Sequence, residues 1–343
     1  MSNDSIFSLF FFITLLVAAN AEDEHIFLPS QLHEEDSVSS SSSCTATDPN
    51  LYYRPVIGIL SHPGDGASGR LSNVTGVSNI PASYVKFVES GGARVIPLFY
   101  NESPQKLTKK LDLVNGVLFT GGWATSGPYL EALEFVFQTA LEKNDGGDHF
   151  PVLGLNLGGN LLIKIVADQA DVLETFNASS LPSSLQLWKS ANDEGSLYQR
   201  FPLDLLTQLS TDCLVLHNHK YAITPRKLQY NRKLSNFFEI LATSNDRDDK
   251  IFVSTARGKN YPVTVNLWQP EKNAFEWGTS LKAPRTENAI RVTQSSANFF
   301  VSEARKSSNR PYAQEVRDNL IYNYQPTYGG TAGKGYDQVY LFE

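Results

Sequence analysis

A Gly-x-Asn-x-Gly pattern centred on Asn156 lies between a predicted strand and a predicted helix. The apolar run at residues 150–154 leads into it, and the apolar run at residues 161–166 follows it. Small residues on both sides allow a sharp elbow in which the central side chain is presented from a strained turn. Such an elbow can present a nucleophile, and the N-terminus of the next helix offers backbone N–H groups to a developing oxyanion. The same glycines are typical of an ordinary strand-to-helix turn, so spacing alone leaves both interpretations open.

The elements that would position this elbow are predicted on its N-terminal side. Short β-branched runs that end in polar or glycine-rich residues indicate strands, and apolar residues at helical spacing indicate helices. The predicted strands cover residues 56–60, 94–98, 116–119 and 150–154, and the predicted helices cover residues 81–91, 104–111 and 129–144. This alternation predicts an α/β fold with a mostly parallel central sheet flanked by helices and a site at the strand ends.

The second half of the chain alternates less regularly. Strands are expected at residues 214–216, 251–255 and 263–267, and a long amphipathic helix at residues 289–306. No internal repeat is evident. With 41% hydrophobic and 11% aromatic residues, the chain can bury a sizeable core.

The chain begins with a predicted leader. The apolar run at residues 6–19 is short for a membrane span, and Ala19-Asn20-Ala21 supplies small residues for cleavage. We expect a signal peptide at residues 1–21, with a short membrane anchor as the alternative because no Lys or Arg precedes the run. Residues 22–50 are acidic and then serine-rich, which predicts a disordered lead or pro-segment. The folded domain is expected at residues 51–343, with no further membrane segment.

In the secretory pathway, the sequons could be glycosylated and the two cysteines could be oxidised. Asn73, Asn101 and Asn177 are candidate glycan acceptors, although such triplets also arise by chance. Cys44 and Cys213 would meet an oxidising compartment, where they either form a disulfide or leave Cys213 as a free buried thiol within a strand. We expect the vacuole or the extracellular space, including the cell wall, as the destination.

The charge of the chain argues against one class of partner. The formal net charge is -7, and no long basic run occurs. Because a phosphate backbone is bound mainly by clustered Lys and Arg, nucleic acid is not an expected partner.

Several sequence blocks resemble the γ-glutamyl hydrolase family of class I glutamine amidotransferase-like proteins, above all its plant members. The resemblance runs in order from about Arg54 to the C-terminus. Its blocks are Arg-Pro-Val-Ile-Gly-Ile-Leu (54–60), Ala-Ser-Tyr-Val-Lys (82–86), Gly-Gly-Ala-Arg-Val-Ile-Pro (91–97), Phe-Thr-Gly-Gly (119–122), Asn-His-Lys-Tyr (218–221), Tyr-Pro-Val (261–263), Trp-Gln-Pro-Glu-Lys (268–272), Ser-Glu-Ala-Arg (302–305) and Ile-Tyr-Asn-Tyr (321–324). It implies a flavodoxin-like sandwich and a cysteine-type peptidase that cleaves folylpoly-γ-glutamates with no metal and no other cofactor.

The chain departs from this family at its reactive positions. The family elbow reads Gly-x-Cys-x-Gly-Phe-Glu and its base lies in Trp-His-Pro-Glu-Lys, whereas this chain has Asn156 for the cysteine, Gln269 for the histidine and Gly-Asn (159–160) for Phe-Glu. An amide is neither a nucleophile nor a group that titrates near neutral pH. Glu271 and His219 match further site residues of the family, but His219 has no nucleophile to activate. We expect a catalytically defective member.

Ligand binding is a property that the family resemblance leaves open for this chain. Backbone N–H groups at Gly122 and Leu157 are expected to meet ligand oxygens, and Arg70, Lys86 and Lys220 are candidates for ligand carboxylates, with ordinary surface charge as the alternative for each. The expected ligand is a folylpoly-γ-glutamate or another γ-glutamyl peptide. Family members dimerise, so a homodimer or a heterodimer with an active paralogue is the expected assembly.

Two rival functions stay open at this stage. The chain could retain slow hydrolysis through an unrecognised nucleophile, or it could be a lumenal structural or interaction protein without a ligand.

Overall fold

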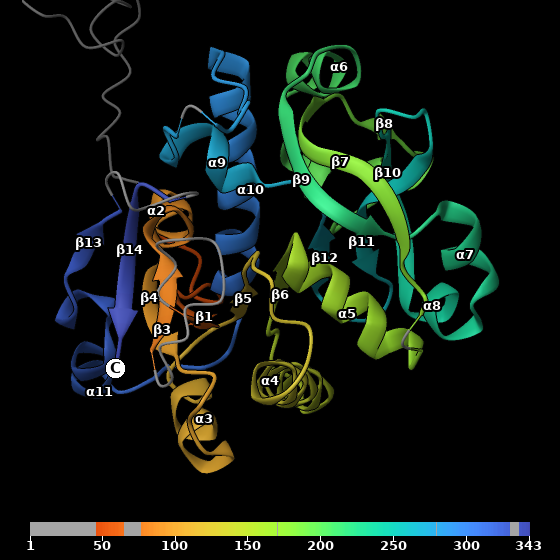
Figure 1. The fold of residues 1–343 in the computed structure, drawn as a ribbon. Coiled ribbons are helices and arrows are strands. Elements are labelled where there is room, and N and C mark those ends of the chain that lie inside the picture. Colours follow the sequence, from red (N-terminus) through yellow and green to blue (C-terminus); the bar gives the residue numbers. More distant parts are fainter. Residues whose placement is uncertain (1–45, 65–76, 170, 279, 330–335) are drawn as a thin grey trace, which may run out of the picture. The chain divides into compact units, whose positions relative to one another are not determined.

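The elbow at Asn156 follows a strand of one large sheet (Figure 1). The computed structural model describes residues 46–64, 77–169, 171–278, 280–329 and 336–343, and residues Asp48–Glu343 form one compact unit. Within the described ranges the sheet has eight strands, in the spatial order β4 (Arg94–Leu98), β1 (Val56–Leu60), β5 (Val117–Phe119), β6 (Val152–Leu155), β12 (Val263–Asn266), β11 (Ile251–Gly258), β10 (Phe238–Asn245) and β8 (Gln186–Leu187).

The sheet is parallel in the half that holds the elbow. Strand pairs are parallel from β4 through β12 and antiparallel from β12 through β8. The prediction of an α/β fold with a mostly parallel sheet is therefore confirmed. Parallel strands direct their carboxyl ends to one edge, so the loops after β5 and β6 lie beside each other.

Strand β1 contributes apolar residues to a core on each face of the sheet. Val56 and Leu60 belong to one buried core, and Ile57 and Ile59 belong to another on the opposite face, as the period of two in a strand requires. The first core also receives α3 (Pro104–Leu111), α4 (Pro128–Asp145) and α5 (Leu157–Ala167), whereas the second receives α2 (Ala82–Ser90) and α10 (Glu287–Arg305).

The remaining elements frame the sheet. They are the two-stranded ribbon of β7 (Glu174–Ser183) and β9 (Val215–Ala222), the small sheet of β13 (Pro326–Tyr328), β14 (Gln338–Phe342), β3 (Ser78–Pro81) and β2 (His62–Pro63), the helices α6 (Leu203–Thr211), α7 (Pro225–Tyr230), α8 (Arg232–Phe237), α9 (Pro270–Phe275) and α11 (Ala313–Asn319), and the 3₁₀ turns η2 (Lys189–Asn192), η3 (Leu197–Arg200) and η4 (Ile321–Asn323). Figure 1 shows the ribbon of β7 and β9 beside α5.

Most elements predicted for the first half are present with small shifts of their ends, and the long helix near residue 289 is α10. One expectation is wrong. Cys213 is not a buried thiol within a strand, because it is exposed and precedes β9. Cys44, its candidate disulfide partner, lies outside the described residues.

Two absences hold for the described part of the chain. No helix there combines the length and apolar character that a membrane crossing needs. No group of three or more His, Cys, Asp or Glu side chains there is arranged to hold a metal ion.

Candidate functional site

Asn156 occupies a true strand-to-helix elbow. It lies between the end of β6 and the start of α5, and its backbone has φ 51° and ψ -109°, a left-handed conformation that is strained for a residue with a side chain. The glycines allow the close approach that fixes this turn. A Cβ on Gly158 would lie 2.5 Å from the Phe119 carbonyl oxygen, and one on Gly154 would lie 2.9 Å from the Gly159 nitrogen. The prediction from glycine spacing thus has a direct steric cause.

The Asn156 amide is held in place by its neighbours. Its side-chain Nδ2 donates to the Asn218 carbonyl at 3.0 Å, and its backbone N–H donates to the Asn266 carbonyl at 2.8 Å. These bonds join the elbow to β9 on one side and to β12 on the other. The side chain therefore sits at the nucleophile position of an elbow but uses its polar group as a hydrogen-bond donor.

A cavity of about 470 Å³ opens beside the elbow, and we call it the elbow cavity. Its lining residues are Gly122, Trp123, Thr125, Asn156, Leu157, Asn160, Leu161, Lys164, Leu173, Asn218, His219, Lys220 and Tyr221. The structure thus brings together five of the residues selected from the sequence, which are Gly122, Asn156, Leu157, His219 and Lys220. Leu157 is the first residue of α5, where backbone N–H groups lack partners within the helix.

Gln269, the other position at which the sequence resemblance predicts a reactive group, lies close to Asn156. A Cβ placed on Gly121 would be 3.4 Å from Gln269 Nε2 and 3.5 Å from Asn156 Cβ, so the two amide residues flank the same glycine. Gln269 is buried, and its Nε2 donates to Glu271 Oε1 at 3.4 Å. Within the described residues, Gln269 Oε1 and Glu271 Oε2 have no hydrogen-bond partner. The local hydrogen bonds of this pair are therefore incomplete.

Burial makes Glu271 a weak acid. Loss of solvent raises its pKa to about 7, the Glu276 charge adds to the rise, and the charge of Lys272 and a hydrogen bond with Tyr84 oppose it. Burial likewise raises the pKa of Tyr84 well above its usual value, so this hydroxyl stays neutral. It accepts the Gly121 N–H at 2.9 Å. The buried acid contacts the amide of Gln269, at the position where the sequence resemblance predicts an imidazole.

His219 lines the cavity as a neutral ring. Burial lowers its pKa to about 4, and Nε2 lies 3.4 Å from Nδ1 of His217. Burial also lowers the pKa of His217, with the neighbouring His219 as the next cause. A neutral imidazole could accept a proton, but Asn156 beside it has no acidic proton to give.

Basic side chains are distributed unevenly around the cavity. Lys164 and Lys220 both line it, and among the described residues that line it none is acidic. Lys86 lies elsewhere, because its Nζ donates to Gln338 Oε1 in β14 at 2.7 Å. Arg70 is outside the described residues. Of the selected bases, only Lys220 is thus placed at the cavity.

Leu161 and Lys164 are not among the residues selected from the sequence, although the helical period of α5, counted from Leu157, could have indicated them. Leu157, Leu161 and Lys164 lie at positions i, i+4 and i+7 of α5, so they share one face, and all three line the cavity. Asn160 was noted only as a substitution, yet its Nδ2 donates to the Tyr221 carbonyl at 2.8 Å and ties α5 to β9. Gly159 also packs closely, since a Cβ there would lie 2.7 Å from Val265 Cγ1.

The sequons fall on different parts of the chain. Asn101 is exposed in the turn after β4, and Asn177 is exposed on β7. Asn73 lies outside the described residues. An exposed position is what a glycan acceptor requires, and their modification stays a prediction.

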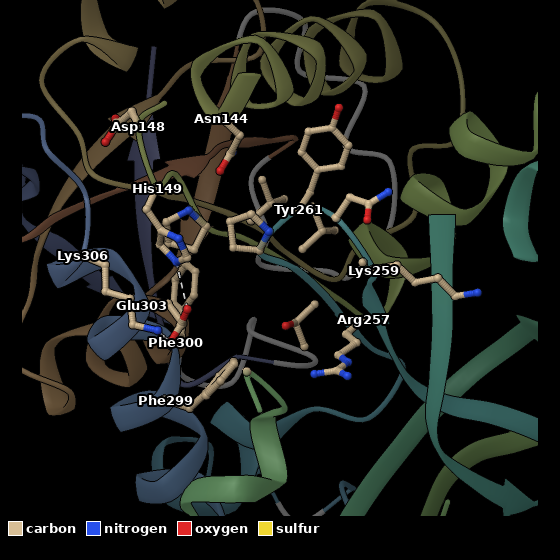
Figure 2. A pocket seen from close by; sticks show the side chains of 18 of the residues that line it. Asn144, Asp148, His149, Arg257, Lys259, Tyr261, Phe299, Phe300, Glu303 and Lys306 are labelled. Carbon is tan, nitrogen blue, oxygen red and sulfur yellow. Dashed lines mark hydrogen bonds and ion pairs between the residues drawn. The ribbon is translucent and has the colours of Figure 1, made fainter. Parts of the chain in front are cut away.

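A larger hollow of about 610 Å³ lies at the start of β6, the opposite end of the strand from the elbow (Figure 2). On one wall His149 and Lys306 converge on Glu303, at 2.8 and 2.7 Å. On the other, Arg257 is paired with Glu239 at 2.9 Å. Glu303 and Arg257 are therefore engaged in ion pairs, and the hollow lies away from the elbow, so the elbow cavity is the better candidate for a functional site.

The chain is similar to known proteins over most of its length. The family model described as Peptidase C26 matches residues 55–135. A gamma-glutamyl hydrolase of Glycine max is 77% identical and covers 100% of both chains. Gamma-glutamyl hydrolase 1 of Arabidopsis thaliana is 57% identical over 94% of this chain and 92% of its own. A solved glutamine amidotransferase of Thermotoga maritima aligns at 13% identity with a TM-score of 0.41, over 74% of this chain and 99% of its own.

The parallel sheet and the elbow at the end of β6 define an α/β protein of the kind that presents a nucleophile at a strand end. The extent of identity to curated relatives narrows this class: the chain belongs to the gamma-glutamyl hydrolase family.

The raised pKa of Glu271 predicts a pH-dependent effect on stability. Its pKa falls from about 7 in the native state to the usual 4.5 on unfolding, so the native state binds more protons between these values and loses stability as the pH rises through them. Glu271→Gln removes this loss. The variant should gain stability relative to the wild type, on the order of 3 kcal/mol, between pH 4.5 and pH 8 in urea unfolding.

Glu303→Gln is the matched control for this experiment. Burial opposes the ionisation of Glu303, but its hydrogen bonds with His149 and Lys306 outweigh burial and lower its pKa below 4.5. Its contribution to stability is therefore present above that pH, and its removal should cost a nearly constant amount of stability from about pH 5.5 to pH 8. A Glu271→Gln variant whose stability relative to the wild type is constant from pH 4.5 to pH 8 would contradict the buried acid.

Proposed function

We propose that this chain binds γ-glutamyl ligands in the elbow cavity and does not hydrolyse them. The observation that carries the proposal is the identity of the elbow residue: Asn156 holds the backbone conformation of a nucleophile but carries an amide. The ligand class comes from the relatives, whose name is gamma-glutamyl hydrolase.

Loss of hydrolysis follows from the chemistry of the two substituted positions. A thiolate attacks an amide carbonyl, and an imidazole takes and returns the proton. The nitrogen lone pair of Asn156 is delocalised into its carbonyl, and the Gln269 amide does not titrate in the working pH range. Among the described residues that line the cavity, His219 is the imidazole, and burial lowers its pKa to about 4, which makes it a weak base.

Retention of binding is supported by the charges and donors that remain. Lys164 and Lys220 give the cavity a positive character without a compensating acidic lining residue in the described chain. The N–H groups of Gly122 and Leu157 are available to a carbonyl or carboxylate oxygen, and Trp123 and Tyr221 supply aromatic faces. Together these features suit a chain of γ-linked carboxylates that ends in an aromatic folyl group.

The biological role that we propose is that of an inactive partner. A chain that binds polyglutamate without turnover could sequester ligand, or it could pair with an active paralogue in a mixed dimer and alter its activity. The location that we propose is the secretory pathway, with the vacuole or the extracellular space as the destination, because of the predicted signal peptide at residues 1–21.

Restoration of the two reactive groups should restore hydrolysis. The double substitution Asn156→Cys with Gln269→His supplies a nucleophile at the elbow and a base in contact with Glu271. We expect glutamate release from folyl penta-γ-glutamate to rise on the order of a thousand-fold or more over the wild type, measured by chromatography of the products.

Each single substitution is the control, because a nucleophile and its base act as a unit and neither alone should bring more than a small part of the gain. A double variant that folds and binds the substrate, yet releases no more glutamate than the wild type, would contradict the view that these two amides account for the defect.

The lysine on α5 should contribute to ligand affinity. Lys164→Gln removes one positive charge from the cavity, and calorimetry with folyl penta-γ-glutamate should show roughly a three- to five-fold weaker Kd with a smaller salt dependence. Lys86→Gln is the matched control because Lys86 is bonded to Gln338 away from the cavity. Equal effects of the two substitutions would argue against binding in the elbow cavity.

A further inference from the structure

The loop after β5 presents four consecutive backbone N–H groups with different fates. Gly121 donates to the Tyr84 hydroxyl at 2.9 Å. Trp123 and Ala124 both donate to Nε2 of His62, at 3.0 and 3.1 Å. Gly122 has no partner for its N–H among the described residues, and it lines the elbow cavity. Three anchored amides therefore surround the one that is available to a ligand.

The protonation state of His62 follows from these contacts. Nε2 accepts two N–H groups, so it carries no proton. The proton of the neutral ring is on Nδ1, which lies 2.9 Å from the Pro63 carbonyl and donates to it. Both ring nitrogens are thus used, and the ring has a single tautomer and orientation.

The ring also fixes the loop by contact. It is buried, with its centroid 4.9 Å from the Trp123 ring and 4.9 Å from the Tyr129 ring of α4. A Cβ on Gly122 would lie 2.3 Å from two atoms of the imidazole. Only a glycine can pass so close to the ring, so His62 and Gly122 form one packing unit.

We propose that His62 is a positioning residue for the elbow cavity: its neutral ring anchors Trp123 and Ala124 and thereby keeps the Gly122 N–H available to an oxygen of the bound ligand. This inference rests on the proposed binding function. It adds the residue that positions Gly122, one of the two backbone N–H donors, Gly122 and Leu157, that are proposed to bind a ligand oxygen. His62 itself is absent from the cavity lining and acts through the loop.

The surroundings of His62 keep the ring neutral over a wide pH range. Burial lowers its pKa to about 4, against the opposing effect of the Pro63 carbonyl. Tyr129 on α4 is held neutral because burial raises its pKa. Asn79 of β3 donates its side-chain amide to the His62 carbonyl at 3.1 Å and is uncharged. Protonation of Nε2 would remove the acceptor for both loop amides, so the positioning is complete at neutral pH and is lost as the pH falls toward 4.

Two substitutions separate the acceptor from the bulk of the ring. His62→Gln can place an amide oxygen near the position of Nε2 and does not titrate, whereas His62→Leu has no acceptor. At pH 7, calorimetry with folyl penta-γ-glutamate should show affinity within about three-fold of the wild type for His62→Gln and about ten-fold weaker for His62→Leu, because two amides lose their partner. The wild-type affinity divided by that of His62→Gln should stay constant from pH 7 to pH 5.5 and fall toward pH 4.

Amide hydrogen exchange of the loop after β5 measures the effect of His62 on this loop in the absence of a ligand. Peptides that cover residues 121–125 should be protected in the wild type and in His62→Gln and should exchange faster in His62→Leu, after correction for intrinsic rates. His149→Gln is the control, because His149 lies near the start of β6, at the opposite end of this strand from the elbow. It should change neither the affinity nor the exchange of this segment. If the wild type binds no ligand, the proposed function fails while the exchange data still decide the positioning. Equal exchange of this segment in the wild type and His62→Leu, or a pH-independent affinity ratio down to pH 4, would overturn the proposal.

Discussion

The left-handed backbone of Asn156 is the constraint on which the site depends. It turns the chain from β6 into α5 within one residue, and it exists because Gly154 and Gly158 let strand, helix and the Phe119 carbonyl approach closely. The turn places the side chain, the first N–H of α5 and the Gly122 loop around one cavity. A backbone strain of this kind costs on the order of 1–3 kcal/mol and is retained only where the surrounding packing enforces it.

The amide residues fit this geometry without reproducing its chemistry. Asn156 donates to the Asn218 carbonyl, and Gln269 donates to Glu271, so each amide side chain has a hydrogen-bond partner in this scaffold. The fit is imperfect at Glu271, whose second oxygen is buried without a partner among the described residues. Burial removes Glu271 from solvent and raises the free energy of its charged form, which is the main cause of its high pKa.

The sequence predicted the parallel half of the fold well because each strand there is a short apolar run followed by a helix. No strand is predicted from the sequence at β7 or β10. In β7 the reason is its composition, since it contains Pro182 and polar residues and pairs with β9 rather than with the large sheet. Asn156 and Gln269 were found through the family motifs. Their close approach and the contact of His62 with the loop after β5 depend on tertiary contacts that no local pattern encodes.

The central claim is that the elbow is intact while its reactive groups are missing. The most direct test is prolonged incubation of purified wild-type chain, from a source that lacks any related hydrolase, with folyl penta-γ-glutamate at pH 5 to 7, followed by quantification of free glutamate. The account predicts release no faster than in a protein-free blank, with the substrate bound and recovered intact. Sustained release in proportion to the amount of protein would contradict it.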